Sequence, residues 1–114
     1  MSREVVFAGG IRTAFGTLGR TLRNMMGEEL AGLAMKGLLE KTKVLEKGGV
    51  VDSVFMGSAI GGNTAINPAR WAALASGLPD TTSASYIEMQ CGSAIDSINH
   101  AAWKILAGQA DIII

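Results

Sequence analysis

The sequence predicts an α/β fold with a mainly parallel sheet. Short apolar runs alternate with amphipathic segments of helical length, which is the pattern of strands joined by helical crossovers. Glycine pairs and an Asn-Pro step mark the boundaries between these segments. The composition agrees with a packed domain rather than a disordered one. Apolar residues make up 48% of the 114 residues, charged residues make up 18%, and the formal net charge is zero.

The first half of the chain is predicted to form a strand, a loop, a helix and a second strand. Residues 5–8 are a short apolar run closed by a glycine pair, which is typical of a buried strand. Residues 11–23 show little periodicity and are expected to form an ordered loop. Residues 28–43 are expected to be helical, and residues 50–60 to form the second strand. The apolar face of this helix follows the spacing of one helical side and comprises Leu30, Leu33, Ala34 and Leu38.

The second half continues the alternation. Asn67-Pro68 predicts the start of a helix that stops at Gly77, because Asn is a good N-cap and Pro fits the first helical position. Residues 83–90 are predicted to form a third strand, residues 91–108 the longest helix, and residues 110–114 the beginning of a fourth strand. The apolar residues of this longest helix fall within one arc, namely Ile95, Ile98, Ala102, Ile105 and Leu106.

The composition excludes several classes of protein. A single cysteine rules out a disulfide-stapled scaffold. The balance of 10 basic and 10 acidic side chains predicts no nucleic-acid partner and no anionic membrane surface. No stretch approaches the roughly 18 apolar residues of a membrane helix, and the first residues lack the pattern of a secretory signal or transit peptide. These features predict a cytoplasmic protein.

Cys91 is the strongest candidate for chemistry. It lies where the third predicted strand ends and the longest predicted helix begins, next to Gly92. The N-terminus of a helix offers unpaired N–H groups and a partial positive charge, and both favour a thiolate. Ligands of parallel sheets also bind at this edge. Cys91 is therefore predicted to be a nucleophile, and the alternative is a buried structural cysteine.

The only histidine is not expected to be the base that a nucleophilic cysteine needs. His100 follows Cys91 by nine residues, which is roughly 13 Å along a continuous helix. It lies on the same side as Asp96, with which it forms an i, i+4 surface pair, and opposite the apolar arc. We therefore expect a solvated or interface histidine. The base for Cys91 must then come from residues outside this chain.

The remaining polar and aromatic residues have structural explanations. The glycine-rich stretches match neither a P-loop nor a dinucleotide-binding motif, and no Cys–His spacing suits a metal ion. Three arginines of the predicted loop could contact a phosphate, but a solvated loop is the simpler expectation. They are Arg12, Arg20 and Arg23. A functional role is possible for Asn63, Asn67 and Arg70, but capping and loop packing are the simpler explanation. The two tryptophans, Trp71 and Trp103, are expected in a core or an interface.

Seven short motifs, in a fixed order along nearly the whole chain, resemble the N-terminal part of a thiolase. This family comprises acetyl-CoA acetyltransferases and 3-ketoacyl-CoA thiolases. Each motif alone is modest, but their combined order is specific. The motifs are Arg12-Thr13-Ala14-Phe15-Gly16, Val51-Asp52-Ser53-Val54, Asn67-Pro68-Ala69-Arg70, Ala72-Ala73, Gly77-Leu78-Pro79, Cys91-Gly92-Ser93 and Gly108-Gln109-Ala110-Asp111.

The resemblance implies an activity in fatty acid metabolism. The thiolate of Cys91 would attack the thioester of acetyl-CoA and form an acetyl-enzyme with loss of CoA, and a carbanion from a second acyl-CoA would then attack. The reverse direction is thiolytic cleavage of a 3-ketoacyl-CoA. The substrates are coenzyme A thioesters, and no covalently bound cofactor is implied.

The resemblance also implies an architecture larger than this chain. Residues 1–114 would form the N-terminal portion of a layered α/β/α domain, with some mixed strand pairing. The activating histidine, a second cysteine, the CoA-binding loop domain and the C-terminal domain would lie further along. The resemblance implies homodimers or homotetramers, and this portion alone is expected to be inactive and to expose apolar surface.

Two positions depart from the family pattern. Glu88 stands where thiolases commonly have Asn, and Ala94 where they commonly have Gly. A carboxylate close to Cys91 opposes thiolate formation unless it points away or is paired. Glu88 therefore keeps a second hypothesis open, a thiolase-like scaffold or binding subunit without the chemistry. A third is another condensing enzyme of the superfamily, such as a ketoacyl synthase.

Overall fold

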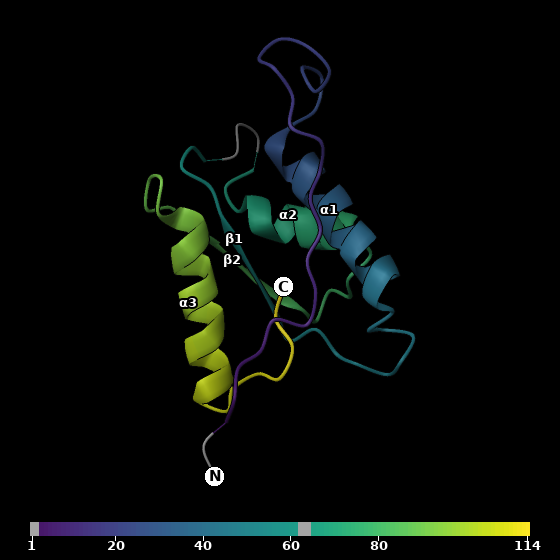
Figure 1. Cartoon of the computed structure of the whole chain (residues 1–114), viewed down its shortest axis with the longest axis vertical. Helices are drawn as coiled ribbons and strands as arrows, with labels where there is room; N and C mark the ends of the chain where they lie inside the picture. Colours follow the sequence, from purple (N-terminus) through teal and green to yellow (C-terminus); the bar gives the residue numbers. More distant parts are fainter. Residues whose placement is uncertain (1–2, 62–64) are drawn as a thin grey trace.

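The computed structural model describes residues 3–61 and 65–114, and in these ranges the chain forms three helices and two strands (Figure 1). Helices and strands alternate along the chain, as the sequence predicts. The elements are α1 (Gly27–Thr42), β1 (Ser53–Gly57), α2 (Pro68–Ala75), β2 (Ser83–Ile87) and α3 (Ser93–Leu106).

The sheet is parallel throughout its described part. β1 and β2 pair in parallel, with Ser53 opposite Ser83. Residues 112–114 extend along the other edge of β1: the Asp52 N–H donates to the Ile112 carbonyl at 2.9 Å, and the Phe55 N–H donates to the Ile114 carbonyl at 2.8 Å. The predicted strand at residues 110–114 is thus present as a short parallel bridge. The mixed pairing expected from the resemblance does not occur among the described strands.

The alternation of side chains along β1 separates two layers of helices. Val54 packs in the apolar core with residues of α1 and α2, and Met56 packs against that core. Phe55 points to the opposite face, where its ring lies 6.0 Å from that of His100 in α3. Because successive side chains of a strand point to opposite faces, α2 covers one face of the sheet and α3 covers the other. This is the layered α/β/α arrangement.

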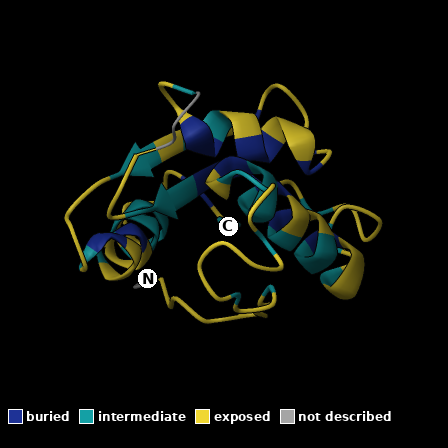
Figure 2. Cartoon of the chain, turned by 90° about the horizontal axis from the view of Figure 1, so that it is seen from above, coloured by how far each residue is buried: buried dark blue, intermediate teal, exposed yellow. Residues whose placement is uncertain are grey.

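The apolar core lies entirely on the α2 side. Figure 2 shows the buried residues concentrated where α2 and α1 meet the sheet. The core consists of Met35 and Leu39 of α1, Val51 and Val54 at β1, Ala72 and Ala73 of α2, and Leu78. Burial of these side chains is the main stabilising contribution that the described residues provide.

The buried face of α1 differs from the predicted one. Leu33 is 55% exposed, and the buried positions are Glu28, Gly32, Met35 and Leu39. The reason is that α2 crosses α1 at Gly32, where a Cβ would lie 3.2 Å from the Ala75 Cβ and 3.3 Å from the Ala72 carbonyl. A side chain at position 32 would press against α2, so the helix turns Gly32, rather than Leu33, toward α2.

The predicted strand at residues 5–8 is wrong for this structure. Residues 4–9 run as an irregular, exposed segment. A groove of about 780 Å³ lies beside them and is lined on its other side by residues 111–114. A strand requires a hydrogen-bonded neighbour, and the groove separates this segment from residues 111–114 at the edge of the sheet.

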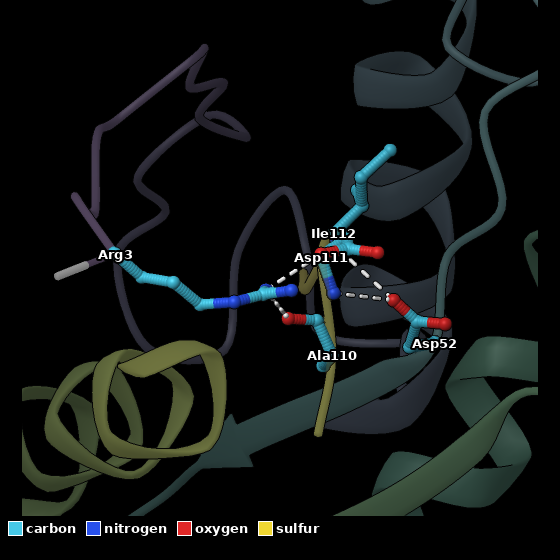
Figure 3. Close-up of polar contacts among 5 residues, drawn as sticks. All are labelled: Arg3, Asp52, Ala110, Asp111 and Ile112. Atoms are coloured by element: carbon cyan, nitrogen blue, oxygen red, sulfur yellow. Dashed lines mark hydrogen bonds and ion pairs between the residues drawn. The ribbon is translucent and has the colours of Figure 1, made fainter. Parts of the chain in front are cut away.

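Charged groups from two distant segments, Arg3 and Asp52, hold residues 110–112 in place (Figure 3). The Arg3 guanidinium donates to the Ala110 carbonyl at 3.1 Å and pairs with the Asp111 carboxylate at 2.7 Å. The Asp52 carboxylate accepts the N–H groups of Asp111 at 2.8 Å and Ile112 at 3.1 Å. These two backbone hydrogen bonds lower the pKa of Asp52 from its usual value of 3.8, because they favour the charged carboxylate.

Helix α3 packs on the sheet with its polar side. Ser93 and Ser97 are its buried residues, and Lys104 donates to the Ser53 hydroxyl on the sheet. The arc that the sequence marks as apolar faces outward, with Ile95 64% exposed and Leu106 53% exposed. Helix–sheet packing thus follows the small and polar side of α3, which allows a close approach.

Several predicted boundaries also change. The second and third strands are shorter than predicted, at five residues each, because pairing stops at Gly57 and Ile87. α3 has 14 residues and is not the longest helix, since α1 has 16. Trp71 and Trp103 are 43% and 58% exposed, so they do not belong to the core.

Candidate active site

Cys91 is a free, exposed thiol on the connection between β2 and α3. The buried structural cysteine considered above is therefore excluded in this structure. Gly92 is the N-cap of α3, so Cys91 precedes the helix by two residues rather than beginning it. The preceding residue, Gln90, has a φ of 49°, in the left-handed region that costs energy for a side chain other than glycine. The thiol thus lies at the tip of a tight, strained turn.

One buried hydroxyl ties the two sides of this turn together. Ser93, 2% exposed, accepts the Met89 N–H at 2.8 Å and donates its hydroxyl to the Gln90 carbonyl at 2.6 Å. The backbone adds a hydrogen bond from the Gly92 N–H to the Met89 carbonyl at 3.0 Å. The residues on both sides of Cys91 are therefore fixed relative to each other.

The Glu88 carboxylate is engaged in the same turn. Its Oε1 accepts the Gln90 N–H at 2.7 Å and the Gln90 side-chain amide at 3.2 Å. The departure from the family pattern thus has a structural role, since the carboxylate supports the left-handed residue. These donors are neutral, so the carboxylate keeps its negative charge beside the turn.

The turn is fixed to the sheet by a close approach at Gly57. A Cβ at this position would overlap the Ser93 carbonyl and the Ala94 N–H, so no other residue fits without a shift. The end of β1 therefore lies directly against the first turn of α3. In the sequence, Gly57 lies near the end of the second predicted strand and follows the thiolase-like motif Val51-Asp52-Ser53-Val54. Its contact with Ser93 joins residues that are distant in the chain, and only the fold reveals it.

His100 is not part of a catalytic group with Cys91 among the described contacts. Its Nδ1 lies 2.9 Å from the Asp96 carbonyl and 3.5 Å from the Asp96 carboxylate. Its ring lies 5.3 Å from that of Trp103 and also contacts Phe55. The predicted i, i+4 pair with Asp96 is confirmed, and the side chain is partly exposed.

The residues assigned to capping behave as predicted where they are described. The Asn67 side chain accepts the Arg70 N–H at 3.0 Å and so caps α2. The Arg70 guanidinium donates to the Thr82 carbonyl at 2.6 Å and to the Asp80 carbonyl at 2.9 Å. Arg70 therefore packs the loop before β2, while Asn63 lies outside the described residues. The loop arginines, Arg12, Arg20 and Arg23, are exposed.

Two cavities of the described residues, the groove beside residues 4–9 and a smaller one, are lined by residues other than Cys91. One of about 200 Å³ lies between the start of α1 and the end of β1, and it is lined in part by Met26, Glu28 and Met56. Within residues 3–61 and 65–114, no group of three or more His, Cys, Asp or Glu side chains could hold a metal ion. No helix in these ranges is long and apolar enough to cross a membrane.

Comparison with protein families matches residues 5–114 to the thiolase N-terminal domain. An acetyl-CoA acetyltransferase of Chromobacterium violaceum is 40% identical over 111 residues, covering 97% of this chain and 28% of that protein. A probable acetyl-CoA acetyltransferase of Escherichia coli is 36% identical over 112 residues, covering 98% of this chain and 28% of that protein. The human mitochondrial trifunctional enzyme subunit beta is 37% identical over 112 residues, covering 98% of this chain and 23% of that protein.

A solved structure has the same fold. The crystal structure of the Bacillus anthracis acetyl-CoA acetyltransferase superposes with a TM-score of 0.78 at 35% identity, covering 86% of this chain and 24% of that one. The chain spans about a quarter of the length of the relatives it matches. The similarity therefore concerns one part of these larger proteins.

Proposed function

The chain belongs to the thiolase family, and from this membership we propose that Cys91 is the nucleophile of an acetyl-CoA C-acetyltransferase. One observation carries the proposal: Cys91 is a free, exposed thiol on a fixed turn between a parallel strand and the start of a helix. Similarity to acetyl-CoA acetyltransferases at 36–40% identity supports it. The proposed substrates are acyl-CoA thioesters, and the reaction requires no covalently bound cofactor.

The proposed reaction has two steps. The Cys91 thiolate attacks the thioester carbonyl of acetyl-CoA, forming an acetyl–sulfur bond and releasing CoA as the thiolate leaving group. A base outside this chain removes a proton from the α-carbon of a second acyl-CoA, and the resulting carbanion attacks the acetyl carbon. The 3-ketoacyl-CoA leaves and Cys91 returns to the thiolate. In reverse, the same steps cleave a 3-ketoacyl-CoA.

We further propose that residues 1–114 are the N-terminal portion of a larger thiolase domain. Two surfaces support this. The groove between residues 4–9 and residues 111–114 separates two extended segments, and the outer side of α3 exposes Ile95, Ile98 and Leu106. Exposed apolar area of this extent is typical of a surface that another segment or subunit covers. The remainder of the chain would supply the base, the second cysteine and the CoA-binding loop.

The same exposed area is compatible with a homodimer or homotetramer, which we propose as the assembly. A free, exposed thiol suits a reducing compartment, so we propose the cytoplasm. Sedimentation of the natively expressed protein and cell fractionation test these two proposals separately. A monomer would contradict the first, and recovery only in an organelle would contradict the second.

Acetylation of Cys91 tests the central proposal. The natively expressed protein that contains these residues is incubated with acetyl-CoA, digested and analysed by mass spectrometry. We expect a base-labile acetyl group on Cys91 in the wild type and in the control Glu40→Gln, an exposed position on α1, and its loss in Cys91→Ala. An equal amount of base-labile acetyl group in Cys91→Ala would refute the assignment.

The scaffold hypothesis predicts a different result in the same experiment. Glu88 is the observation that favours it, because a carboxylate near the thiol disfavours the thiolate. An inert Cys91, unreactive toward both acetyl-CoA and iodoacetamide at neutral pH, would support a binding subunit without the chemistry. Acetylation that requires an acyl carrier protein instead of CoA would point to a ketoacyl synthase.

A further inference from the structure

We propose that Ser93 is a positioning residue for Cys91, acting through the backbone of the turn between β2 and α3. This inference rests on the proposed role of Cys91 as a nucleophile. Ser93 lies two residues after the cysteine and does not need to touch the substrate. Its hydroxyl instead joins the residues before Cys91 to the helix after it.

The hydroxyl of Ser93 makes two hydrogen bonds to the segment that precedes the cysteine. It accepts the Met89 N–H at 2.8 Å and donates to the Gln90 carbonyl at 2.6 Å. The Ser93 N–H also donates to the same carbonyl at 3.2 Å. The bonds span residues 89 to 93, so Cys91 lies inside the loop that they close.

The turn needs such support because Gln90 is strained. A residue with a side chain at a φ of 49° persists only where the surroundings fix it. Two groups do so here, since Glu88 holds the Gln90 N–H and Ser93 holds the Gln90 carbonyl. Without the hydroxyl, the turn can relax toward the ordinary region and carry Cys91 away from the N-terminus of α3.

Ser93 is itself fixed to the sheet, so it can transmit a defined position. It is 2% exposed, and the absence of a side chain at Gly57 lets the end of β1 lie directly against its carbonyl. The Ser97 hydroxyl donates to that carbonyl at 2.9 Å. The sheet therefore determines where Ser93 lies, and Ser93 determines where the turn lies.

Ser76 provides a matched control. It is also a buried serine at one end of a helix, at 5% exposure, and its hydroxyl donates to the Ala73 carbonyl at 2.6 Å. It differs in lying at the C-terminal end of α2, on the other face of the sheet from the turn. Ser93→Ala and Ser76→Ala therefore each remove a buried, hydrogen-bonded hydroxyl, and only the first releases the turn.

The test is the pH profile of iodoacetamide alkylation at Cys91 in the natively expressed protein, at a temperature where each variant is folded. In Ser93→Ala we expect the alkylation rate to fall about tenfold across the profile, because the released turn no longer holds the thiol beside the N-terminus of α3. Ser76→Ala keeps the wild-type profile. Glu88, the charged group described beside the turn, is unchanged in both variants.

Several outcomes overturn the proposal. If Ser93→Ala and Ser76→Ala lower the melting temperature but leave the profile unmoved, Ser93 is only structural. If Ser93→Ala does not fold, Ser93→Thr keeps the hydroxyl and should keep the wild-type profile; a shift in this variant would contradict the proposal. The alkylation readout does not require turnover, so it can succeed even where acetylation of Cys91 fails.

Discussion

The face of the sheet under α2 is packed with apolar side chains, whereas the face under α3 is held largely by polar contacts. On the α2 face, Leu39 and Val54 belong to a core that excludes water. On the α3 face, the Ser53 hydroxyl accepts from Lys104 and the Phe55 ring lies against His100. The five-residue strand β1 contributes side chains to both faces. The first face provides stability, and the second provides a defined position for the turn that carries Cys91.

The largest expected effect is on the apolar face. Leu39→Ala removes a buried side chain of the core and should lower the free energy of unfolding by about 2–5 kcal/mol. Chemical denaturation of the natively expressed protein measures the loss. The alkylation rate of folded Cys91 should stay at its wild-type value, because Leu39 belongs to the opposite layer. A large change in that rate would show that the two faces are not independent.

Gly57→Ala tests the polar face directly. The added Cβ overlaps the Ser93 carbonyl, and relieving it should cost about 1–3 kcal/mol. Unlike Leu39→Ala, this change should also slow alkylation of Cys91, because it displaces the first turn of α3. Gly10→Ala is the control, since a Cβ there would meet nothing within 4 Å. Equal alkylation rates in both glycine variants would contradict the proposed connection.

The stability of the sheet edge beside β1, where Asp52 holds residues 111 and 112, depends on pH through the Asp52 carboxylate. Its pKa is lowered in the folded state by the backbone N–H groups of Asp111 and Ile112. Its contribution is therefore complete above the unfolded pKa of 3.8 and is lost as the pH falls through the folded pKa. Asp52→Asn should lose about 1–2 kcal/mol at neutral pH.

Denaturation of Asp52→Asn and the wild type at a series of pH values checks this prediction. The difference between the two should shrink only below pH 3.8, while the control Asp80→Asn, an exposed position, should follow the wild type throughout. A difference that stays constant across the whole acidic range would mean that the charge of Asp52 is not what stabilises the strand.

The smallest effect is expected at Glu88. Glu88→Gln keeps an oxygen that accepts the Gln90 N–H but removes the negative charge, so alkylation of Cys91 should become about twofold faster. Glu88→Ala removes the acceptor as well and should slow alkylation by releasing the turn. If both variants change the rate in the same direction, charge and positioning cannot be separated at this residue.

Local signals predicted the elements of the fold well. The start of α2 was predictable because Asn67 and Pro68 act within one turn of the helix, and the acidic start and basic end of α1 are equally local. The location of Cys91 between β2 and α3 was predictable because it follows from the order of elements, and its role as a nucleophile stays a prediction. Each of these inferences depends on neighbours in the sequence.

Features that depend on distant partners were not predictable. The apolar run at residues 5–8 has the composition of a strand but no hydrogen-bonded neighbour among the described residues, so it remains irregular. The amphipathic pattern of α3 locates its apolar residues but does not say which side meets the sheet. The support of Cys91 by Gly57 and Ser93 joins two elements 36 residues apart (93 − 57), and nothing in either segment alone reveals it.

The contacts of Arg3 and Asp52 with residues 110–112 also constrain the order in which the chain folds. Arg3 and Asp111 are separated by 108 residues, so closing that loop costs more entropy than closing the short connections between neighbouring elements. The packing of α1 against α2 draws on contacts nearer in sequence and should form first. During synthesis, the N-terminal segment would wait until residues 110–112 emerge from the ribosome, and only then would the edge beside β1 be completed.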